Sequence, residues 1–256
     1  MHQGERGQSV RLVKNIASRK ILQNTHPDER RSRVSKEMSA YRITTFERVL
    51  MIIDISWPIS PTMTSYKNNK PTTFTQLKEF ATDGVRDANI QLNTHAGTHI
   101  DAPAHFLATG TTIDHVPLES LIGSAVVLDL TNVEEAITDH DLQAHVFAAG
   151  DIVLLKTKNS ALLAKAPFDF KFISLTASGA ALLAARGVKA VGIDYLGIER
   201  NQPNHETHTI LLEQQIPIIE GLRLGQAAPG RYQFYCLPLA IVGLEAAPAR
   251  AILIKA

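Results

Sequence analysis

The stretch His95-Ala-Gly-Thr-His-Ile-Asp-Ala-Pro-Ala-His105 places three histidines and an aspartate close together. Neutral imidazoles and carboxylates are the ligands that zinc selects, or manganese where oxygen ligands predominate. His95 and His99 could share one face of a helical turn, but Gly97 and Pro103 argue against a long regular helix. We therefore expect a bent segment whose side chains surround one point. The alternative is a polar loop of solvated histidines, but four candidate ligands at this spacing favour a metal site.

Further ligands for a catalytic ion must come from elsewhere in the chain. His205 and His208 are three residues apart at the start of an expected helix, so they share a face. His140 and His145 lie in a helical segment rich in Asp and Ala and are expected at the surface. Glu220 ends the apolar run Ile-Pro-Ile-Ile. A carboxylate at the end of a buried strand needs a partner such as a cation, but Glu220 could equally emerge into solvent.

The composition is that of an ordinary globular protein, with 45% hydrophobic and 20% charged residues. A net charge of +1 gives no reason to expect nucleic acid or an anionic membrane as partner. The chain has no apolar run of about 18 residues and no apolar segment typical of a secretory signal, so we expect a cytoplasmic protein. Cys236 is the only cysteine and lies in an apolar run, so we expect it to be buried and inert.

Residues 1–48 differ from the rest of the chain. They carry 11 of the 26 basic residues and show no tight hydrophobic periodicity. Asp28 and Glu29 argue against a targeting peptide. The lack of interleaved aromatic residues argues against an arm that binds nucleic acid. Another alternative is upstream sequence preceding an internal start at Met51. We expect a loosely ordered extension over residues 1–48 and one folded domain over residues 49–256.

From Met51 onward, short apolar runs alternate with helical stretches, which predicts a single α/β domain with a mixed sheet. No glycine pattern of a dinucleotide-binding or phosphate-binding loop is present. The expected helices cover residues 138–147, 180–186 and 207–214. The expected strands cover residues 51–55, 73–80, 89–94, 125–130, 151–156, 172–175, 188–193, 216–219, 231–236 and 251–254.

Residues 95–105 match H-x-G-T-H-x-D-x-P-x-H, which resembles the signature of the cyclase-type metal-dependent hydrolases. This family includes bacterial kynurenine formamidases and isatin hydrolases. Similar blocks occur at residues 51–60, 150–157, 187–194 and 208–220, so the resemblance covers about residues 51–256. It implies a compact swivelling β/β/α-type fold. It also implies a homodimer or homotetramer, because relatives usually form such oligomers.

The resemblance implies a metal site with two halves. By the motif match, His95, His99 and Asp101 hold a first ion. Asp101 bridges to a second ion that is held by His208, and Glu220 is able to touch both ions. Isatin hydrolases are thought to use a single manganese and to lack the acid equivalent to Glu220. Its presence here favours two zinc ions, with manganese as the alternative.

The activity implied is hydrolysis of an amide-type C–N bond by metal-bound hydroxide, with His105 as proton shuttle. The substrate is expected to be an aryl formamide such as N-formylkynurenine, or a cyclic amide or imide. The alternatives are a metal-dependent cyclase or dehydratase that stabilises an enolate, and a metal-binding protein without turnover.

Two aromatic residues are candidates for substrate contact. Tyr66 lies where kynurenine formamidases carry an aromatic residue, typically tryptophan, against the substrate ring. Trp57 is a candidate pocket residue, although a core position suits it equally well. Lys67-Asn68-Asn69 replaces the usual Pro-Gly-Asp, and Gly197 replaces a common serine. These departures weigh against N-formylkynurenine as the particular substrate.

Overall fold

The computed structural model describes residues 51–69 and 71–255. These residues belong to one compact unit, Leu50–Ala256. The extension expected over residues 1–48 lies outside the described residues. Within the described part of the chain, no helix is both long and apolar enough to cross a membrane.

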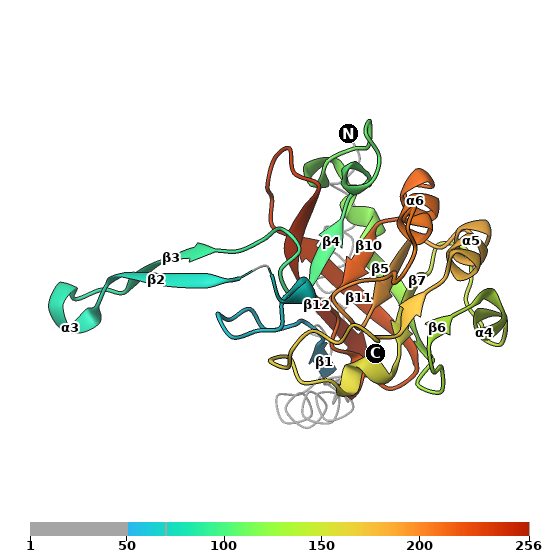
Figure 1. Cartoon of the computed structure of the whole chain (residues 1–256), viewed down its shortest axis with the longest axis horizontal. Helices are drawn as coiled ribbons and strands as arrows, with labels where there is room; N and C mark the ends of the chain where they lie inside the picture. The colour runs from blue at the N-terminus through green and yellow to red at the C-terminus, as the bar shows by residue number, and fades with distance from the viewer. Residues whose placement is uncertain (1–50, 70, 256) are drawn as a thin grey trace, which may run out of the picture. The chain divides into compact units, whose positions relative to one another are not determined.

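The centre of the fold is an 8-stranded mixed sheet in the order β1-β12-β11-β5-β7-β9-β10-β4 (Figure 1). β12 pairs with β1 and β11 and also with β4, so the sheet closes into a barrel. The strands are β1 (Met51–Asp54), β4 (His99–Asp101), β5 (Ile122–Asp129), β7 (Ile152–Lys156), β9 (Ala190–Ile193), β10 (Ile218–Glu220), β11 (Gly230–Pro238) and β12 (Ala246–Lys255).

Strands β5, β7, β9 and β10 are parallel neighbours and are buried on both faces. Ala125 and Val127 pack in one hydrophobic cluster, with residues of β11 and β12. Val126 and Leu128 pack in a second cluster, with residues of the helices. A strand that is covered on both sides needs apolar residues throughout, which explains continuous runs such as Ala-Val-Val-Leu.

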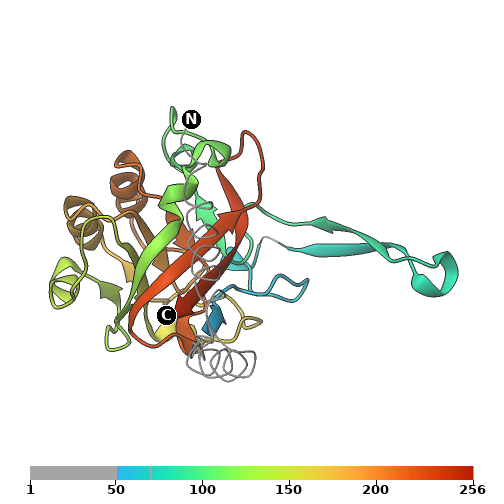
Figure 2. The ribbon, with the colours of Figure 1, turned by 180° about the vertical axis from the view of Figure 1, so that it is seen from behind.

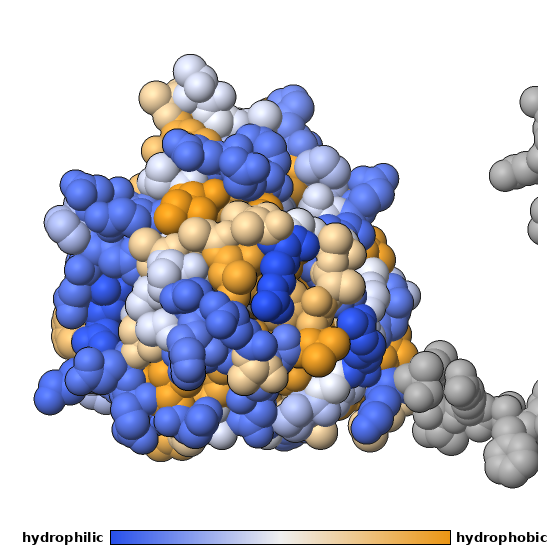
Figure 3. Space-filling model, turned by 90° about the vertical axis from the view of Figure 1, so that its right-hand side faces the viewer, coloured by the Kyte–Doolittle hydropathy of each residue, from blue (hydrophilic) through white to orange (hydrophobic). Residues whose placement is uncertain are grey.

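Three helices cover the outer face of these strands: α4 (Asp139–Gln143), α5 (Ala177–Ala185) and α6 (Glu206–Glu213) (Figure 1). A capping box between Thr138 and Asp141 starts α4, and the Thr176 hydroxyl caps α5. The surface of this side of the barrel mixes hydrophobic and hydrophilic residues (Figure 3). The 3₁₀ helices are η1 (Tyr66–Asn68), η2 (Pro103–His105), η3 (Ile113–His115), η4 (Leu118–Ser120), η5 (Lys158–Ala161) and η6 (Leu224–Gln226).

Two small sheets complete the described fold. β6 (Ala136–Ile137) and β8 (Ser174–Leu175) pair in parallel. β2 (Thr73–Lys78) and β3 (Asp87–Gln91), joined through the short helix α3 (Phe80–Asp83), form an antiparallel arm. The arm projects from the barrel in both ribbon views (Figures 1 and 2).

The structure confirms the expected mixed α/β class, and each expected strand overlaps an observed one. One local prediction is wrong: residues 99–101 form strand β4 rather than part of an irregular bent segment. This segment becomes a strand because it pairs with β10 and β12 on its two sides. Cys236 is fully buried, as expected, and burial raises the pKa of its thiol.

Candidate metal centre

Two glycines allow the histidine segment and the end of β10 to approach each other closely. Gly97 has φ +64°, which bends the chain between His95 and β4. Gly221, directly after Glu220, has φ +69°. A Cβ atom at Gly221 would lie 2.2 Å from the Gly97 carbonyl oxygen. The close contact between these two backbones leaves no room for a side chain at Gly221, and it places Glu220 beside the histidine segment.

The first half of the centre is formed by His95, His99 and Asp101. His95 Nδ1 lies 2.9 Å from Asp101 Oδ1, and His99 Nε2 lies 3.5 Å from the same oxygen. The His99 and Asp101 side chains are each 1% exposed. The three residues do not lie on a helical turn, because His99 and Asp101 are two apart on β4 and therefore point to the same side of the strand.

The second half adds His208 from α6 and Glu220 from the end of β10. His208 Nε2 lies 3.7 Å from Asp101 Oδ2 and 3.5 Å from Glu220 Oε1. Glu220 Oε2 lies 3.4 Å from His99 Nε2, and Glu220 Oε1 accepts a hydrogen bond from the backbone N–H of Ile198. Glu220 does not emerge into solvent but is 5% exposed. The two halves meet at the carboxylates of Asp101 and Glu220.

The polar atoms of this centre fit a cation. His99 Nε2 and both carboxylate oxygens of Asp101 are buried and have no hydrogen-bond partner in the described part of the chain. Burial acts to raise the pKa of Asp101, but contacts with His208 and His95 outweigh it and hold this pKa well below its ordinary value. The pKa of Glu220 falls to about 2, because contacts with His208 and His99 outweigh burial and the neighbouring Asp101. Two buried, ionised carboxylates beside imidazole nitrogens form a donor set that suits zinc or manganese.

Two of the three candidate ligand histidines lie against oxygen atoms of Gly97 and of Glu245, the residue directly before β12. His99 Nδ1 lies 2.9 Å from the Gly97 carbonyl oxygen, so Nδ1 carries the proton and Nε2 faces Asp101. His95 Nε2 lies 3.3 Å from Glu245 Oε1, and its Nδ1 faces Asp101. Such outer contacts fix the tautomer and the ring orientation of metal-binding histidines.

The third candidate ligand histidine, His208, lies against Glu199. His208 Nδ1 lies 2.9 Å from Glu199 Oε2, which leaves its Nε2 facing Asp101. Glu199 is 8% exposed and also contacts His205 Nδ1 through its other oxygen. The sequence predicts that His205 and His208 share a face of one helix. In the structure, His205 is instead the half-exposed N-cap of α6. It belongs to the surroundings of the centre.

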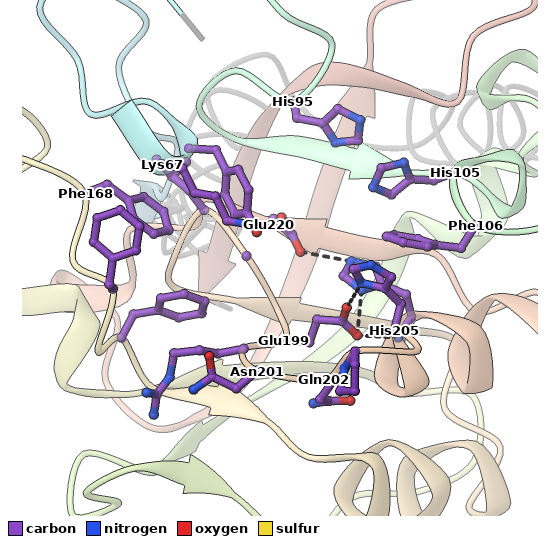
Figure 4. Close-up of a pocket in the computed structure, with 18 residues that line it drawn as sticks. Lys67, His95, His105, Phe106, Phe168, Glu199, Asn201, Gln202, His205 and Glu220 are labelled. Atoms are coloured by element: carbon purple, nitrogen blue, oxygen red, sulfur yellow. Dashed lines mark hydrogen bonds and ion pairs between the residues drawn. The ribbon is translucent and has the colours of Figure 1, made fainter. Parts of the chain in front are cut away.

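His105 lies at the edge of the centre, on η2. Its ring centroid is 4.3 Å from that of His95 and 5.7 Å from that of His208. Burial lowers the pKa of His105 to about 4. The ring faces the pocket beside Phe106 (Figure 4). This position, next to the candidate ligands and open to the pocket, is compatible with a proton shuttle.

A pocket of about 670 Å³ opens above the centre. Phe168 and Lys67 lie on one side of it, and His95, His105 and Phe106 lie on the other (Figure 4). This volume is suited to a small organic ligand. The aromatic residues that line it are Tyr66, Phe106, Phe168, Phe170 and Phe172.

Of the two residues expected to contact the substrate, the structure places only Tyr66 in the pocket lining. Tyr66 lines the pocket, with its ring centroid 5.1 Å from that of Phe168. Trp57 does not line it, which corrects the expectation of a substrate contact there. Its side chain is 2% exposed, donates to the Ala164 carbonyl oxygen and packs edge-on against Tyr195. Trp57 therefore supports the pocket wall from within the core.

Several site residues carry no signal in the sequence. Glu199 and Glu245 are single acids in unremarkable surroundings. Glu199 lies in the loop that leads into α6 and contacts His208 nine residues later, whereas Glu245 reaches His95 through the pairing of β12 with β4. The pocket phenylalanines come from an irregular segment whose apolar residues could equally have been core. A weak signal was available, because Phe168, Phe170 and Phe172 alternate in Phe-Asp-Phe-Lys-Phe.

The closed barrel and the buried His, Asp and Glu residues define an α/β protein with a candidate metal centre below a pocket. The family model of the cyclases matches residues 53–200. Cyclase-like protein 3 of Arabidopsis thaliana is 34% identical over 217 residues, which cover 80% of this chain and 79% of the relative. The chain belongs to the cyclase family.

Solved structures agree with this assignment. A potential metal-dependent hydrolase with cyclase activity is 40% identical, with a TM-score of 0.75, and the match covers 81% of this chain and 99% of the other. A predicted metal-dependent hydrolase from Bacillus stearothermophilus is 40% identical, with a TM-score of 0.74, and the match covers 81% and 100%. An isatin hydrolase bound to the product analogue thioisatinate shares the fold at 17% identity, with a TM-score of 0.73, over 90% and 99% of the two chains. The two relatives at 40% identity support an enzyme of the metal-dependent hydrolase class.

Proposed function

We propose that the protein hydrolyses an amide-type C–N bond in an aromatic formamide or a cyclic amide, with two zinc ions per chain. The observation that carries this proposal is the convergence of His95, His99, Asp101, His208 and Glu220 at the base of an aromatic pocket. A single-manganese centre is the alternative, and it requires fewer of these ligands.

The first ion would be held by His95, His99 and Asp101, and the second by Asp101, His208 and Glu220. When bound, such an ion lowers the pKa of a coordinated water to about 7 and polarises a carbonyl oxygen. The protein's contribution is to hold the ligand atoms in place. Asp101 lies between the two halves, with one oxygen toward His95 and the other toward His208.

His105 would move the proton. Its imidazole can accept a proton from the attacking water and return it to the nitrogen that leaves as the C–N bond breaks. The ring lines the pocket, and one of its nitrogens lies within 4.8 Å of a nitrogen of His95 and of a carboxylate oxygen of Asp101. A general acid–base group of this kind contributes about 10² to 10⁴ in rate.

The pocket supports a substrate with an aromatic ring and an acidic group. Tyr66, Phe168 and Phe172 present ring faces and edges against which a flat substrate can pack. Lys67 lies across the pocket from the histidines (Figure 4), where its ammonium group can bind a carboxylate. N-formylkynurenine has both features, and so do other acidic aryl formamides and the ring-opened products of cyclic aryl amides.

The test is turnover by the full chain loaded with zinc or with manganese. The substrates are N-formylkynurenine, isatin, a simple aryl formamide and a cyclic imide, and the matched control is the Asp101→Asn variant. The proposal expects hydrolysis of at least one of these amides, with loss of the activity in Asp101→Asn. Stoichiometric metal binding without hydrolysis of any of them above the rate of Asp101→Asn would overturn it.

A further inference from the structure

One side of the pocket is an aromatic wall, which we define as Tyr66, Phe168 and Phe172 (Figure 4). The Phe168 ring lies at its centre, with its centroid 5.1 Å from that of Tyr66 and 5.7 Å from that of Phe172. Behind the wall, the Tyr195 ring lies 5.3 Å from the Phe168 ring. The three residues pack in a small hydrophobic cluster that is separate from the two larger clusters of the barrel. A shift of Phe168 would therefore change the shape of the whole wall.

The aromatic wall combines two segments that are about 100 residues apart in the sequence. Tyr66 lies on η1, whereas Phe168 and Phe172 lie in the loop over residues 162–172, which follows η5. Neither segment is a strand of the barrel. Because strand pairing does not align them, their relative position depends on packing and on the hydrogen bonds that join them.

These hydrogen bonds hold alternate residues of the loop. The Ala164 carbonyl oxygen accepts from the Thr64 backbone N–H at 2.9 Å, and the Ala166 carbonyl oxygen accepts from the Thr64 hydroxyl at 2.6 Å. The Phe168 backbone N–H donates to Asn68 Oδ1 at 2.9 Å. Of these three loop residues, Phe168 is the one that lines the pocket. The Asn68 amide is therefore the tether that acts directly on the pocket.

The backbone at this tether is unusual. Lys67 has φ +50° and Asn68 has φ +59°, so two successive residues other than glycine are left-handed. Asparagine tolerates this conformation better than most residues. Such conformations persist only where the surroundings hold them, and they gather at functional sites. Asn68 meets two requirements here, because it allows the turn and also supplies the acceptor for the Phe168 N–H.

We propose that Asn68 is a positioning residue that makes the pocket selective for flat aromatic rings. Asn68 is not among the described residues that line the pocket, so it acts through Phe168. Its amide oxygen holds the Phe168 N–H, and the Tyr195 hydroxyl accepts from the next N–H, that of Asp169, at 2.6 Å. Held from both sides, the Phe168 backbone keeps the ring in its place in the wall. This inference rests on the proposed function, because it takes an aromatic amide as the substrate.

Two substitutions separate this role from that of a residue that only shapes the turn. Glycine adopts a positive φ freely, so Asn68→Gly retains the turn but removes the acceptor. Asn68→Asp retains an acceptor oxygen in a residue that also tolerates the left-handed conformation. A loss of selectivity in Asn68→Gly that Asn68→Asp restores would therefore belong to the hydrogen bond.

The test is calorimetric titration of the zinc-loaded full chain with benzoate and with cyclohexanecarboxylate. Both acids offer the same carboxylate to Lys67 and to a bound ion, so the ratio of their Kd values reports on the ring alone. The wild type is expected to bind benzoate at least about threefold more tightly than cyclohexanecarboxylate. Asn68→Gly should weaken benzoate binding by about threefold to tenfold, the usual effect of one hydrogen bond, and should change cyclohexanecarboxylate binding little. Asn68→Asp should keep the wild-type ratio.

The matched control is Asn69→Ala, which changes the next residue, also exposed, and should keep the wild-type ratio. Emission from Trp57, the only tryptophan of the chain, should be the same in all variants, because its Nε1 donates to Ala164 of the same loop.

Equal binding of the two acids by the wild type would overturn the proposal, and so would a wild-type ratio in Asn68→Gly. A ratio in Asn68→Asp as low as that in Asn68→Gly would also overturn it. Because the titration needs no turnover, a chain that hydrolyses no amide would contradict the proposed function and leave this result unaffected.

Discussion

His99 and Glu220 are direct partners across the antiparallel strands β4 and β10. Their side chains meet with His99 Nε2 3.4 Å from Glu220 Oε2. Strand register therefore joins the histidine segment to an acid far along the chain. Because a shift of one residue would turn Glu220 to the opposite face, the pairing of these two short strands determines whether the second half of the metal centre exists.

Glu199 is expected to strengthen metal binding without being a ligand. Its carboxylate contacts His208 Nδ1 at 2.9 Å and holds the ring with Nε2 toward Asp101. Glu199→Gln keeps the shape but removes the charge. Zinc affinity, measured by competition with a chelator, should fall by about 10- to 100-fold.

The matched control for this measurement is Glu213→Gln. Glu213 lies on the same helix, α6, but is exposed and distant from the ligands. Its zinc affinity should equal that of the wild type. An affinity of Glu199→Gln equal to that of this control would show that Glu199 does not orient His208.

His105→Ala should lower kcat by about 10² to 10⁴, because proton transfer to the leaving nitrogen loses its donor. The KM for the same amide should change little, since His105 contributes only one part of the pocket wall. Steady-state kinetics of the zinc-loaded variant measure both quantities. A large rise in KM at unchanged kcat would assign His105 to substrate binding instead.

Lys67→Met should raise KM for an acidic aryl amide and leave kcat almost unchanged. The ammonium group lies across the pocket from the reacting side and would bind the substrate equally before and during the reaction (Figure 4). Lys67→Arg keeps the charge and should remain near the wild type. For a neutral aryl formamide, Lys67→Met and the wild type should have equal KM values. A rise in KM of the same size for both substrates would contradict a role in binding the acid.

Arg231→Met should destabilise the fold at neutral pH. Arg231 binds both oxygens of Asp151, at 2.8 and 2.9 Å. This hydrogen bonding lowers the Asp151 pKa below its ordinary 3.8. A lowered carboxyl pKa stabilises the fold above pH 3.8, and the stabilisation is lost as the pH falls through the lowered value. The loss in free energy of unfolding should be about 1 kcal/mol at pH 7.

Urea unfolding at neutral and acidic pH measures this effect. The difference between Arg231→Met and the wild type should shrink as the pH falls below 3.8. Arg250→Met is the control, because the pair of Arg250 with Asp54 is more exposed and should contribute little. A difference for Arg231→Met that is the same at both pH values would exclude the pairing with Asp151 as its cause.

The sequence could identify the candidate ligands of the metal centre because four of them stand in one short motif. His99 and Asp101 are two residues apart on β4, so their side chains point to the same face of the strand. This relationship depends on the local sequence alone. The spacing from His208 to Glu220 resembles that of the family, but the sequence alone does not explain why these two residues meet. Its physical basis is that α6 leads directly into β10, whose partner is β4.

Other features depend on contacts that no local pattern encodes. β4 is too short to show periodicity, and it becomes a strand through its pairing with β10 and β12. From the sequence, Trp57 could equally line the pocket or lie in the core. In the structure it packs against Tyr195 and Arg223 and lies in the core. The uncovered arm could be predicted as strands, but its projection from the barrel could not, because exposure depends on the whole fold.

In the proposed centre, Asp101 joins the two halves of the metal site whereas His105 is not a ligand. Metal content and zinc affinity of the wild type, Asp101→Asn and His105→Ala, measured on the same preparations, test this assignment most directly. We expect two equivalents of zinc in the wild type and in His105→Ala, and loss of both in Asp101→Asn. No metal binding by the wild type, or equal loss of zinc in the two variants, would contradict this assignment.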